Sequence, residues 1–168
     1  MEFQDINQKL KETREELLTT LNDLSRDQLN ARRKPDSWSI GQVCQHLIKT
    51  EELYVLAIKR GLRSNEDSII ESKPVELLLD RSRKLEAPDI VKPTEEILER
   101  EEIIEQLHIS RVKFNEFLNT LEDPSVLSRR YFKHPAFQEM LLIEWLESLY
   151  LHEQRHIAQM NEIKDGFK

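Results

Sequence analysis

Apolar residues recur at intervals of three and four along four long stretches of the chain, the spacing of one face of an α-helix. This spacing predicts helices over residues 5–24, 39–62, 94–121 and 141–163. A polar link, residues 63–93, separates the second and third stretches, and a short helix is expected within it from about Val75 to Arg81. Period-two strand patterns are hard to find. The pattern therefore predicts an all-α four-helix bundle, one domain over residues 1–168, with a long crossover link between helices two and three.

Local sequence signals mark several of these helix boundaries. Ser39 and Gln42 have the spacing of a capping box, in which two side chains satisfy backbone N–H groups at the start of a helix. Gly61 is expected to end the same helix. Thr94, directly after Pro93, is expected to begin the third helix.

Composition and charge narrow the class of protein. Hydrophobic residues make up 38% and charged residues 34% of the 168 residues, and glycines number only 3, which is typical of a helical globular protein. The net charge of -7 and the lack of any basic block argue against nucleic-acid binding. The apolar runs are too short to cross a bilayer, and the first residues lack the apolar core of a signal peptide. We therefore expect a cytoplasmic protein that binds neither nucleic acid nor membranes.

Four polar residues stand on helix faces that the bundle should bury. They are His46 in the second helix, Arg111 in the third, and His152 and His156 in the fourth. A buried polar group is costly unless it is hydrogen-bonded or ligated. His152 and His156 are four residues apart, so they project from adjacent turns on one face and can bind one metal ion. Together with His46 they form a candidate divalent-metal site with open coordination positions, the layout of a catalytic site.

Residues 152–156 read HEQRH and match the H-E-x-x-H string of zinc proteases. The extended protease form needs Gly and His where this chain has Gln159 and Glu162. No strand is expected that would hold a peptide substrate by its backbone. The stretch therefore supports two metal ligands at H-x-x-x-H spacing rather than a protease. Glu153 remains either a catalytic base or a surface residue, and the catalytic residues stay unknown.

Three stretches resemble the DinB-like (DinB/YfiT) superfamily of bacterial four-helix bundles. They are WSIGQVCQHL at 38–47, DRSRKLEAPDIVKPT at 80–94, and HPAFQEMLLIEWLESLYLHEQRHIAQM at 134–160. The resemblance implies that His46, His152 and His156 bind a divalent metal, most often nickel or zinc. It also implies a metal-dependent enzyme, either a hydrolase or a transferase that joins a low-molecular-weight thiol to a small electrophile. Related bundles often pair, so a homodimer is expected. One difference is Gln138 after Phe137, where the family commonly has glycine.

Alternatives remain open from the residues alone. The three histidines can be hydrogen-bonded core residues of a dimeric scaffold, or ligands in a stress-related bundle that binds a metal or ligand without catalysis. Arg111 is a candidate for holding an anionic substrate group, and the alternative is a buried ion pair. His134, before Pro135, is a fourth ligand or a hydrogen-bonded loop residue.

Other residues near the histidines have supporting roles in this interpretation. Gln42 and Gln159 each lie within one turn of a histidine and are candidates to orient it. Trp38 and Trp145 are expected to anchor the core, and His108 to lie on the surface. Cys44 is the single cysteine, and it faces away from His46 on the helix, so a thiol nucleophile would have to come from a cosubstrate.

Overall fold

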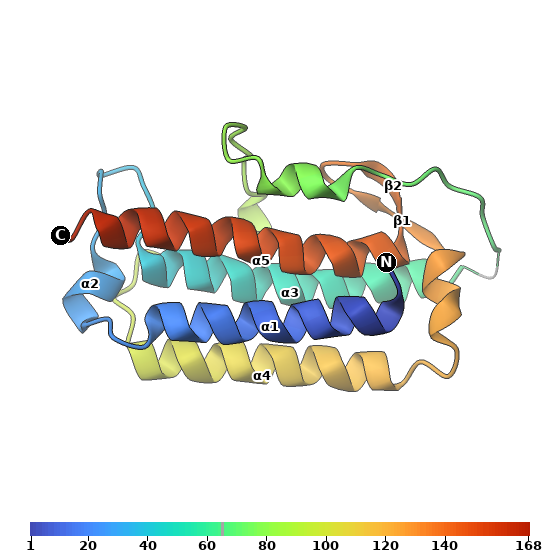
Figure 1. Ribbon diagram of the computed structural model, residues 1–168, viewed down its shortest axis with the longest axis horizontal. Helices are drawn as coiled ribbons and strands as arrows, with labels where there is room; N and C mark the ends of the chain where they lie inside the picture. Colours follow the sequence, from blue (N-terminus) through green and yellow to red (C-terminus); the bar gives the residue numbers. More distant parts are fainter. Residues whose placement is uncertain (65) are drawn as a thin grey trace.

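The computed structural model describes residues 1–64 and 66–168, which contain four long helices lying side by side (Figure 1). The four are α1 (Phe3–Leu21), α3 (Ile40–Leu62), α4 (Arg100–Asn119) and α5 (Leu142–Asp165), and the short helix α2 (Arg26–Asn30) lies between α1 and α3. α3 and α4 run in the same direction, because the link between them crosses back along the bundle (Figure 1). The predicted all-α four-helix bundle with a long crossover is confirmed.

The crossover link covers one side of the bundle, and we call residues 66–93 the cover. It contains two 3₁₀ helices, η1 (Val75–Leu79) and η2 (Asp89–Val91), so the short helix expected near Val75 is present as a tighter helix. A third, η3 (Pro124–Ser128), follows α4. It leads into an antiparallel hairpin of β1 (Tyr131–His134) and β2 (Gln138–Leu141). Strands of four residues are too short to reveal their alternation in the sequence, which explains why the hairpin was not predicted.

The helix boundary that differs most from the prediction is the start of α4. The third long helix begins at Arg100 rather than at Thr94, because Thr94 is held against α3 instead. Its backbone N–H donates to Gln45 Oε1 (3.0 Å), and its carbonyl accepts from Gln42 Nε2 (3.0 Å). The Ser39–Gln42 capping box at the start of α3 is confirmed, with both reciprocal hydrogen bonds present.

Gly61 does not end α3 but lies inside it, one residue before the end. A Cβ atom at this position would lie 2.5 Å from Leu142 Cδ2 and 3.1 Å from the carbonyl oxygen of Tyr131. The glycine therefore serves close packing of α3 against the hairpin and the start of α5, not helix termination.

The apolar core is divided into two clusters by a polar layer. One cluster lies towards the hairpin and includes Phe114 and Trp145, and the other lies towards α2 and includes Leu17 and Val43. Each long helix contributes apolar residues to both clusters and one charged residue between them. These charged residues are Arg14 on α1, Glu51 on α3, Arg111 on α4 and Glu153 on α5, and all are buried. The bundle therefore buries charge at its middle, where side chains from all four helices meet.

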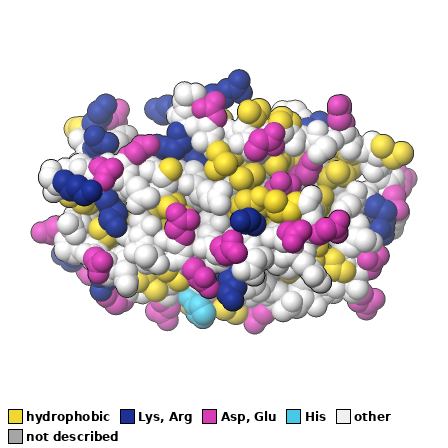
Figure 2. Space-filling model, in the orientation of Figure 1, with side chains coloured by type: hydrophobic (Ala, Val, Ile, Leu, Met, Phe, Trp, Pro, Cys, Tyr) yellow, Lys and Arg dark blue, Asp and Glu magenta, His cyan; other side chains and the backbone are white. Residues whose placement is uncertain are grey.

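Acidic and basic side chains are mixed over the face shown in Figure 2, and apolar side chains gather near η1. Leu77 and Leu79 of η1 are 43% and 46% exposed. In the part of the chain that the structure describes, every helix is too short or too polar to cross a membrane.

Candidate metal centre

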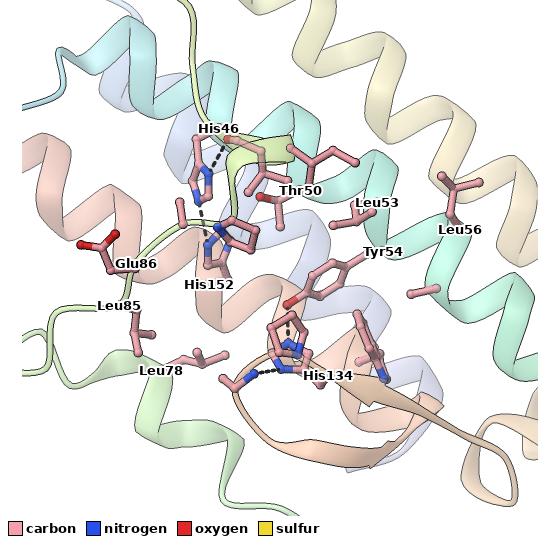
Figure 3. Close-up of a pocket in the computed structure, with 18 of the residues that line it drawn as sticks. His46, Thr50, Leu53, Tyr54, Leu56, Leu78, Leu85, Glu86, His134 and His152 are labelled. Atoms are coloured by element: carbon pink, nitrogen blue, oxygen red, sulfur yellow. Dashed lines mark hydrogen bonds between the residues drawn. The ribbon is translucent and has the colours of Figure 1, made fainter.

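His46 on α3 and His152 and His156 on α5 meet at the base of a pocket beneath the cover (Figure 3). The Nε2 atom of His152 lies 3.1 Å from Nε2 of His46 and 3.1 Å from Nε2 of His156. The i, i+4 spacing on α5 places two of the rings one turn apart, and the close packing of α3 on α5 brings the third to them. The structure thus brings together all three of the histidines that the sequence singled out.

Hydrogen bonds on the far side of two rings fix which nitrogen faces the centre. His46 Nδ1 lies 2.9 Å from the carbonyl oxygen of Val91, which only accepts, so Nδ1 carries the proton. His156 Nδ1 lies 2.7 Å from Gln159 Oε1 and donates to it in the same way. In the neutral rings, both Nε2 atoms therefore present lone pairs to the centre. This is the arrangement by which proteins orient imidazole ligands of a metal.

The donor set fits a divalent transition-metal ion. Two nitrogens that are each about 2.1 Å from one ion lie roughly 3.0 to 3.4 Å apart at octahedral or tetrahedral angles, which matches the two Nε2 pairs. Without an ion, His152 can donate its single Nε2 proton fully to only one neighbouring lone pair. Its own Nδ1 is buried and has no hydrogen-bond partner among the described residues. Three imidazoles hold an ion while leaving coordination positions open to the pocket.

Burial keeps these rings neutral. Desolvation lowers the pKa of His156 to about 3 and also lowers the pKa of His46 and of His152, whose pKa is further lowered by its two histidine neighbours. A neutral imidazole has the free lone pair that a metal requires, so the site is prepared for binding at neutral pH.

The pocket above the histidines has a volume of about 600 Å³ and is lined mainly by apolar side chains from α3, α5, the cover and the hairpin. One stripe of α3 supplies His46, Thr50, Tyr54 and Arg60. Thr50 Oγ1 is buried without a partner among the described residues. A pocket of this size accommodates a small organic molecule beside the metal site.

Backbone carbonyl oxygens of the cover accept several of the hydrogen bonds that fasten it to the bundle. The guanidinium of Arg155 donates to the carbonyl oxygens of Leu78, Asp80 and Arg83. Lys49 Nζ donates to the Lys92 carbonyl (2.7 Å), next to the Val91 carbonyl that holds His46. The wall of the pocket is thus tied both to His46 and to the helix that carries the other two histidines of the cluster.

Arg111 and Glu153, the two catalytic candidates from the sequence, lie in the polar layer and do not line the pocket. Arg111 Nε donates to Glu51 Oε1 (2.9 Å), and its Nη2 donates to Glu153 Oε2 (3.0 Å). Arg14 binds the same two carboxylates, with Nη2 to Glu51 Oε2 at 2.6 Å and Nε to Glu153 Oε1 at 3.0 Å. The buried ion pair considered for Arg111 is therefore the arrangement observed. Glu153 is neither a surface residue nor free to act as a base.

The remaining candidates divide between the pocket and the core. Gln159 contacts a metal-site histidine, whereas Gln42 completes the α3 cap and makes no hydrogen bond to His46. Trp38 and Trp145 both line the pocket, so their role is not limited to the core. Cys44 is fully buried and burial raises its thiol pKa to about 12, while His108 is exposed, both as expected.

His134 on β1 is held by hydrogen bonds and is not part of the histidine cluster. Its Nδ1 accepts from the backbone N–H of Ala136 (3.0 Å), and its Nε2 lies 3.1 Å from the hydroxyl oxygen of Tyr54. The loop-residue alternative for His134 thus describes its observed contacts.

Sequence reasoning missed Tyr54 as a pocket residue, and it missed Arg14 and Glu51 as partners of Arg111. Tyr54 lies eight residues after His46 and four after Thr50, so helical spacing alone would have placed it on the same stripe. Arg14 and Glu51 each lie directly after a threonine that falls at helical spacing with the apolar residues of its helix, Thr13 and Thr50, so a predicted buried face wider than one stripe would have included them.

Known proteins resemble the chain in both sequence and fold. Residues 9–160 match the DinB superfamily. The uncharacterized protein YuaE of Bacillus subtilis (strain 168) is 30% identical over 154 residues, which span 92% of this chain and 94% of that protein.

Two solved structures share the fold at lower identity. TT2238, described as a four-helix bundle protein, is 20% identical with a TM-score of 0.65, and the match covers 96% of this chain and 99% of that one. YfiT from Bacillus subtilis, described as a probable metal-dependent hydrolase with an unusual four-helix bundle topology, is 18% identical with a TM-score of 0.67. That match covers 99% of this chain and 90% of YfiT. The sequence match over most of the chain and the common fold lead to one conclusion: the chain belongs to the DinB superfamily.

Proposed function

We propose that this protein is a metal-dependent enzyme that holds a divalent ion, nickel or zinc, at His46, His152 and His156 and acts on a small electrophile. The observation that carries the proposal is the convergence of Nε2 atoms 3.1 Å apart at the base of a pocket of about 600 Å³. The description of YfiT as a probable metal-dependent hydrolase supports it. The reaction is either transfer of a thiol to the electrophile or its hydrolysis.

The chain contributes orientation, neutral ligands and an apolar surrounding. The Val91 carbonyl and Gln159 Oε1 orient two of the rings, and burial keeps the imidazoles unprotonated. The apolar walls bind the body of the substrate and exclude water from it. A bound divalent ion would lower the pKa of a thiol or water at its open position and so supply the nucleophile.

Neither the cysteine of the chain nor the glutamate of the HEQRH stretch supplies that nucleophile. Cys44 is fully buried outside the pocket, and its raised pKa keeps it as a thiol at neutral pH. Glu153 is bound by two arginines. A nucleophilic thiol, if one is used, therefore arrives as a cosubstrate of low molecular weight, which fits the volume of the pocket.

Metal binding is tested by elemental analysis of the purified protein and by thermal unfolding with a panel of divalent ions. At a free-ion concentration about 1,000 times Kd, binding stabilises the fold by roughly 4 kcal/mol, which corresponds to a rise in Tm of about 8 to 16 °C. His46→Ala, His152→Ala and His156→Ala should each abolish this rise, and the exposed control His108→Ala should keep it. An undiminished rise in all three variants would refute the site.

Activity is tested on the metal-loaded protein with two sets of reagents. One set joins cysteine, glutathione or coenzyme A to 1-chloro-2,4-dinitrobenzene, and the other consists of p-nitrophenyl esters without a thiol. Turnover that a chelator abolishes, and that added metal restores, identifies the transferase or the hydrolase according to the set. Metal binding without turnover in either set would instead favour the non-catalytic binding protein.

A further inference from the structure

A second polar group lines the same pocket, on the hairpin side of the histidines. The hydroxyl of Tyr54 on α3 points towards the ring of His134 on β1, and both residues are buried (Figure 3). The ring of Trp145 packs against both, with ring centroids 4.9 Å from Tyr54 and 4.7 Å from His134. Two walls of the pocket thus meet at one hydrogen bond.

The contacts of His134 determine the direction of that hydrogen bond. The backbone N–H of Ala136 donates to His134 Nδ1 (3.0 Å), so this nitrogen carries a lone pair and no proton. Burial lowers the pKa of His134 to about 4, so the ring is neutral near pH 7 and carries its one proton on Nε2. His134 Nε2–H therefore donates to the hydroxyl oxygen of Tyr54, 3.1 Å away.

The proton of Tyr54 has no strong acceptor in the part of the chain that the structure describes. Burial raises the pKa of Tyr54 to about 12, so the hydroxyl keeps its proton. Its other polar neighbour is Ser148 Oγ at 3.4 Å, which gives its own proton to the Trp145 carbonyl at 2.8 Å. A contact of 3.4 Å between hydroxyl oxygens is long for a hydrogen bond. A ligand oxygen at normal distance would capture the Tyr54 proton instead.

We propose that Tyr54 is a ligand-binding residue that donates its hydroxyl proton to a carbonyl or oxyanion oxygen of the substrate, and that His134 is the residue that positions it. The ligand is then a small molecule with one end at the metal site, an acceptor oxygen beside Tyr54, and an otherwise apolar body. Thr50, one turn of α3 from both His46 and Tyr54, offers a second, unpartnered hydroxyl between the two ends. The inference rests on the proposed function in placing the other end of the ligand at the histidines.

The experiment compares two probe series on metal-loaded protein. The first contains methyl esters of 2-mercaptoacetic, 3-mercaptopropanoic, 4-mercaptobutanoic and 6-mercaptohexanoic acid, which carry a carbonyl at increasing distance from the thiol. The second contains alkanethiols of the same lengths, without the carbonyl. Trp38 and Trp145 are the 2 tryptophans of the chain and both line the pocket, so their fluorescence reports binding.

Tyr54→Phe removes one oxygen atom and should weaken the tightest ester about 3- to 10-fold, the value of one hydrogen bond, while alkanethiol affinity changes less than 2-fold. Tyr150→Phe, the same change outside the pocket, should alter neither series. His134→Leu should reduce the preference for the ester, and His134→Gln, whose amide can still donate to Tyr54, should restore part of it. A denaturant curve for each variant confirms that it is folded.

The other possible results would contradict the role of Tyr54, the role of His134 or the metal-dependent function. Equal weakening of both series, or unchanged ester affinity across all lengths in Tyr54→Phe, shows that Tyr54 makes no bond to the ligand. If His134→Leu still binds the esters more tightly than the alkanethiols to the same extent, His134 does not position Tyr54. Thiol binding to the unaltered protein that a chelator does not affect refutes the metal-dependent function and leaves the Tyr54 comparison valid. The absence of any thiol binding overturns both.

Discussion

Two polar clusters lie next to each other in the middle of the bundle, and α3 and α5 contribute to both. In the ionic cluster, Glu51 and Glu153 are each bound by two arginines, so the charges are fully paired. In the histidine cluster, lone pairs converge on one another, and a buried nitrogen of His152 has no partner within the described ranges 1–64 and 66–168. His152 and Glu153 are adjacent in sequence, yet helical geometry turns them about 100° apart, into different clusters.

The number of hydrogen-bond partners thus distinguishes buried polar groups that stabilise the fold from buried polar groups that are able to bind a ligand. A buried polar group whose hydrogen bonds are all made gains no free energy from a further partner. A buried group that lacks a hydrogen bond favours the binding of a ligand that supplies it. The paired cluster is closed off from the pocket, and the unpaired one opens into it. Substitutions in the two clusters should therefore affect different properties of the protein.

The largest effect is expected for Glu153→Ala, because it leaves two buried arginines with one carboxylate partner instead of two. The loss in unfolding free energy should be about 3 to 5 kcal/mol, as for other broken buried ion pairs, and urea denaturation measures it. Glu162→Ala, which breaks the exposed pair with Arg81, should change stability by less than about 1 kcal/mol. Comparable losses in the two variants would mean that the ionic layer has no special structural role.

Acid should destabilise the pocket side of the core. The folded-state pKa of His134, about 4, lies below the value near 6.5 of a free imidazole, so the unfolded chain binds a proton that the folded chain excludes. The stability that His134 contributes above pH 6.5 is therefore lost as pH falls towards 4, by about 3 kcal/mol for this one residue. Urea curves of metal-free protein at pH 7, 6 and 5 measure this slope. His134→Gln should make it shallower and leave the part that comes from His46, His152 and His156, whose pKa values burial also lowers, and an unchanged slope in that variant would contradict the assignment.

The hairpin that presents His134 contains local backbone strain. Gln138 has φ of 62°, the only positive φ of a non-glycine residue in the described part of the chain. Gln138→Gly should therefore raise unfolding free energy by roughly 0.5 to 1 kcal/mol, because glycine adopts this conformation without a Cβ clash. Thermal unfolding measures the gain, with Glu139→Gly, at a neighbouring strand position, as the destabilised control.

The smallest stability change should come from His152→Ala in metal-free protein. The substitution removes a ring whose Nδ1 is buried without a partner, so the loss should stay below about 1 kcal/mol while metal binding disappears. Glu153→Ala, the adjacent change, should show the reverse: a large loss of stability with metal binding retained in the folded protein. Isothermal titration with nickel or zinc, alongside urea curves, tests both. A loss above about 3 kcal/mol in His152→Ala would remove the distinction between the clusters.

The helices that carry the metal centre could be predicted because their signals are local. α3 has a capping box and a long apolar face, and the seam of α5 contains the two histidines at i, i+4 spacing. The start of α4 could not be predicted, since it depends on hydrogen bonds from Thr94 to α3. Tertiary contacts there override a pattern that locally favours helix.

The ionic layer and the pocket wall were harder to predict, for two physical reasons. A helix between two neighbours buries a face wider than one seam, so Glu51 and Arg14, just off the predicted seams, are buried as well. The fixed tautomers of His46 and His134 depend on backbone groups of Val91 and Ala136. Backbone groups are the same for almost every residue type, so the sequence does not reveal which of them will be used.

Contacts through backbone groups also affect which positions of the sequence can change within this family. Arg155, Lys49 and His46 hold the cover by its carbonyl oxygens, which are present whatever side chain occupies those positions. Side chains of the cover that line the pocket, such as Leu85 and Ile90, are not among these attachments. Evolution can therefore exchange them and alter the shape of the pocket while the attachments and the three histidines stay in place. Mutational drift in this segment would then change which molecules fit the pocket before it changes how the chain folds.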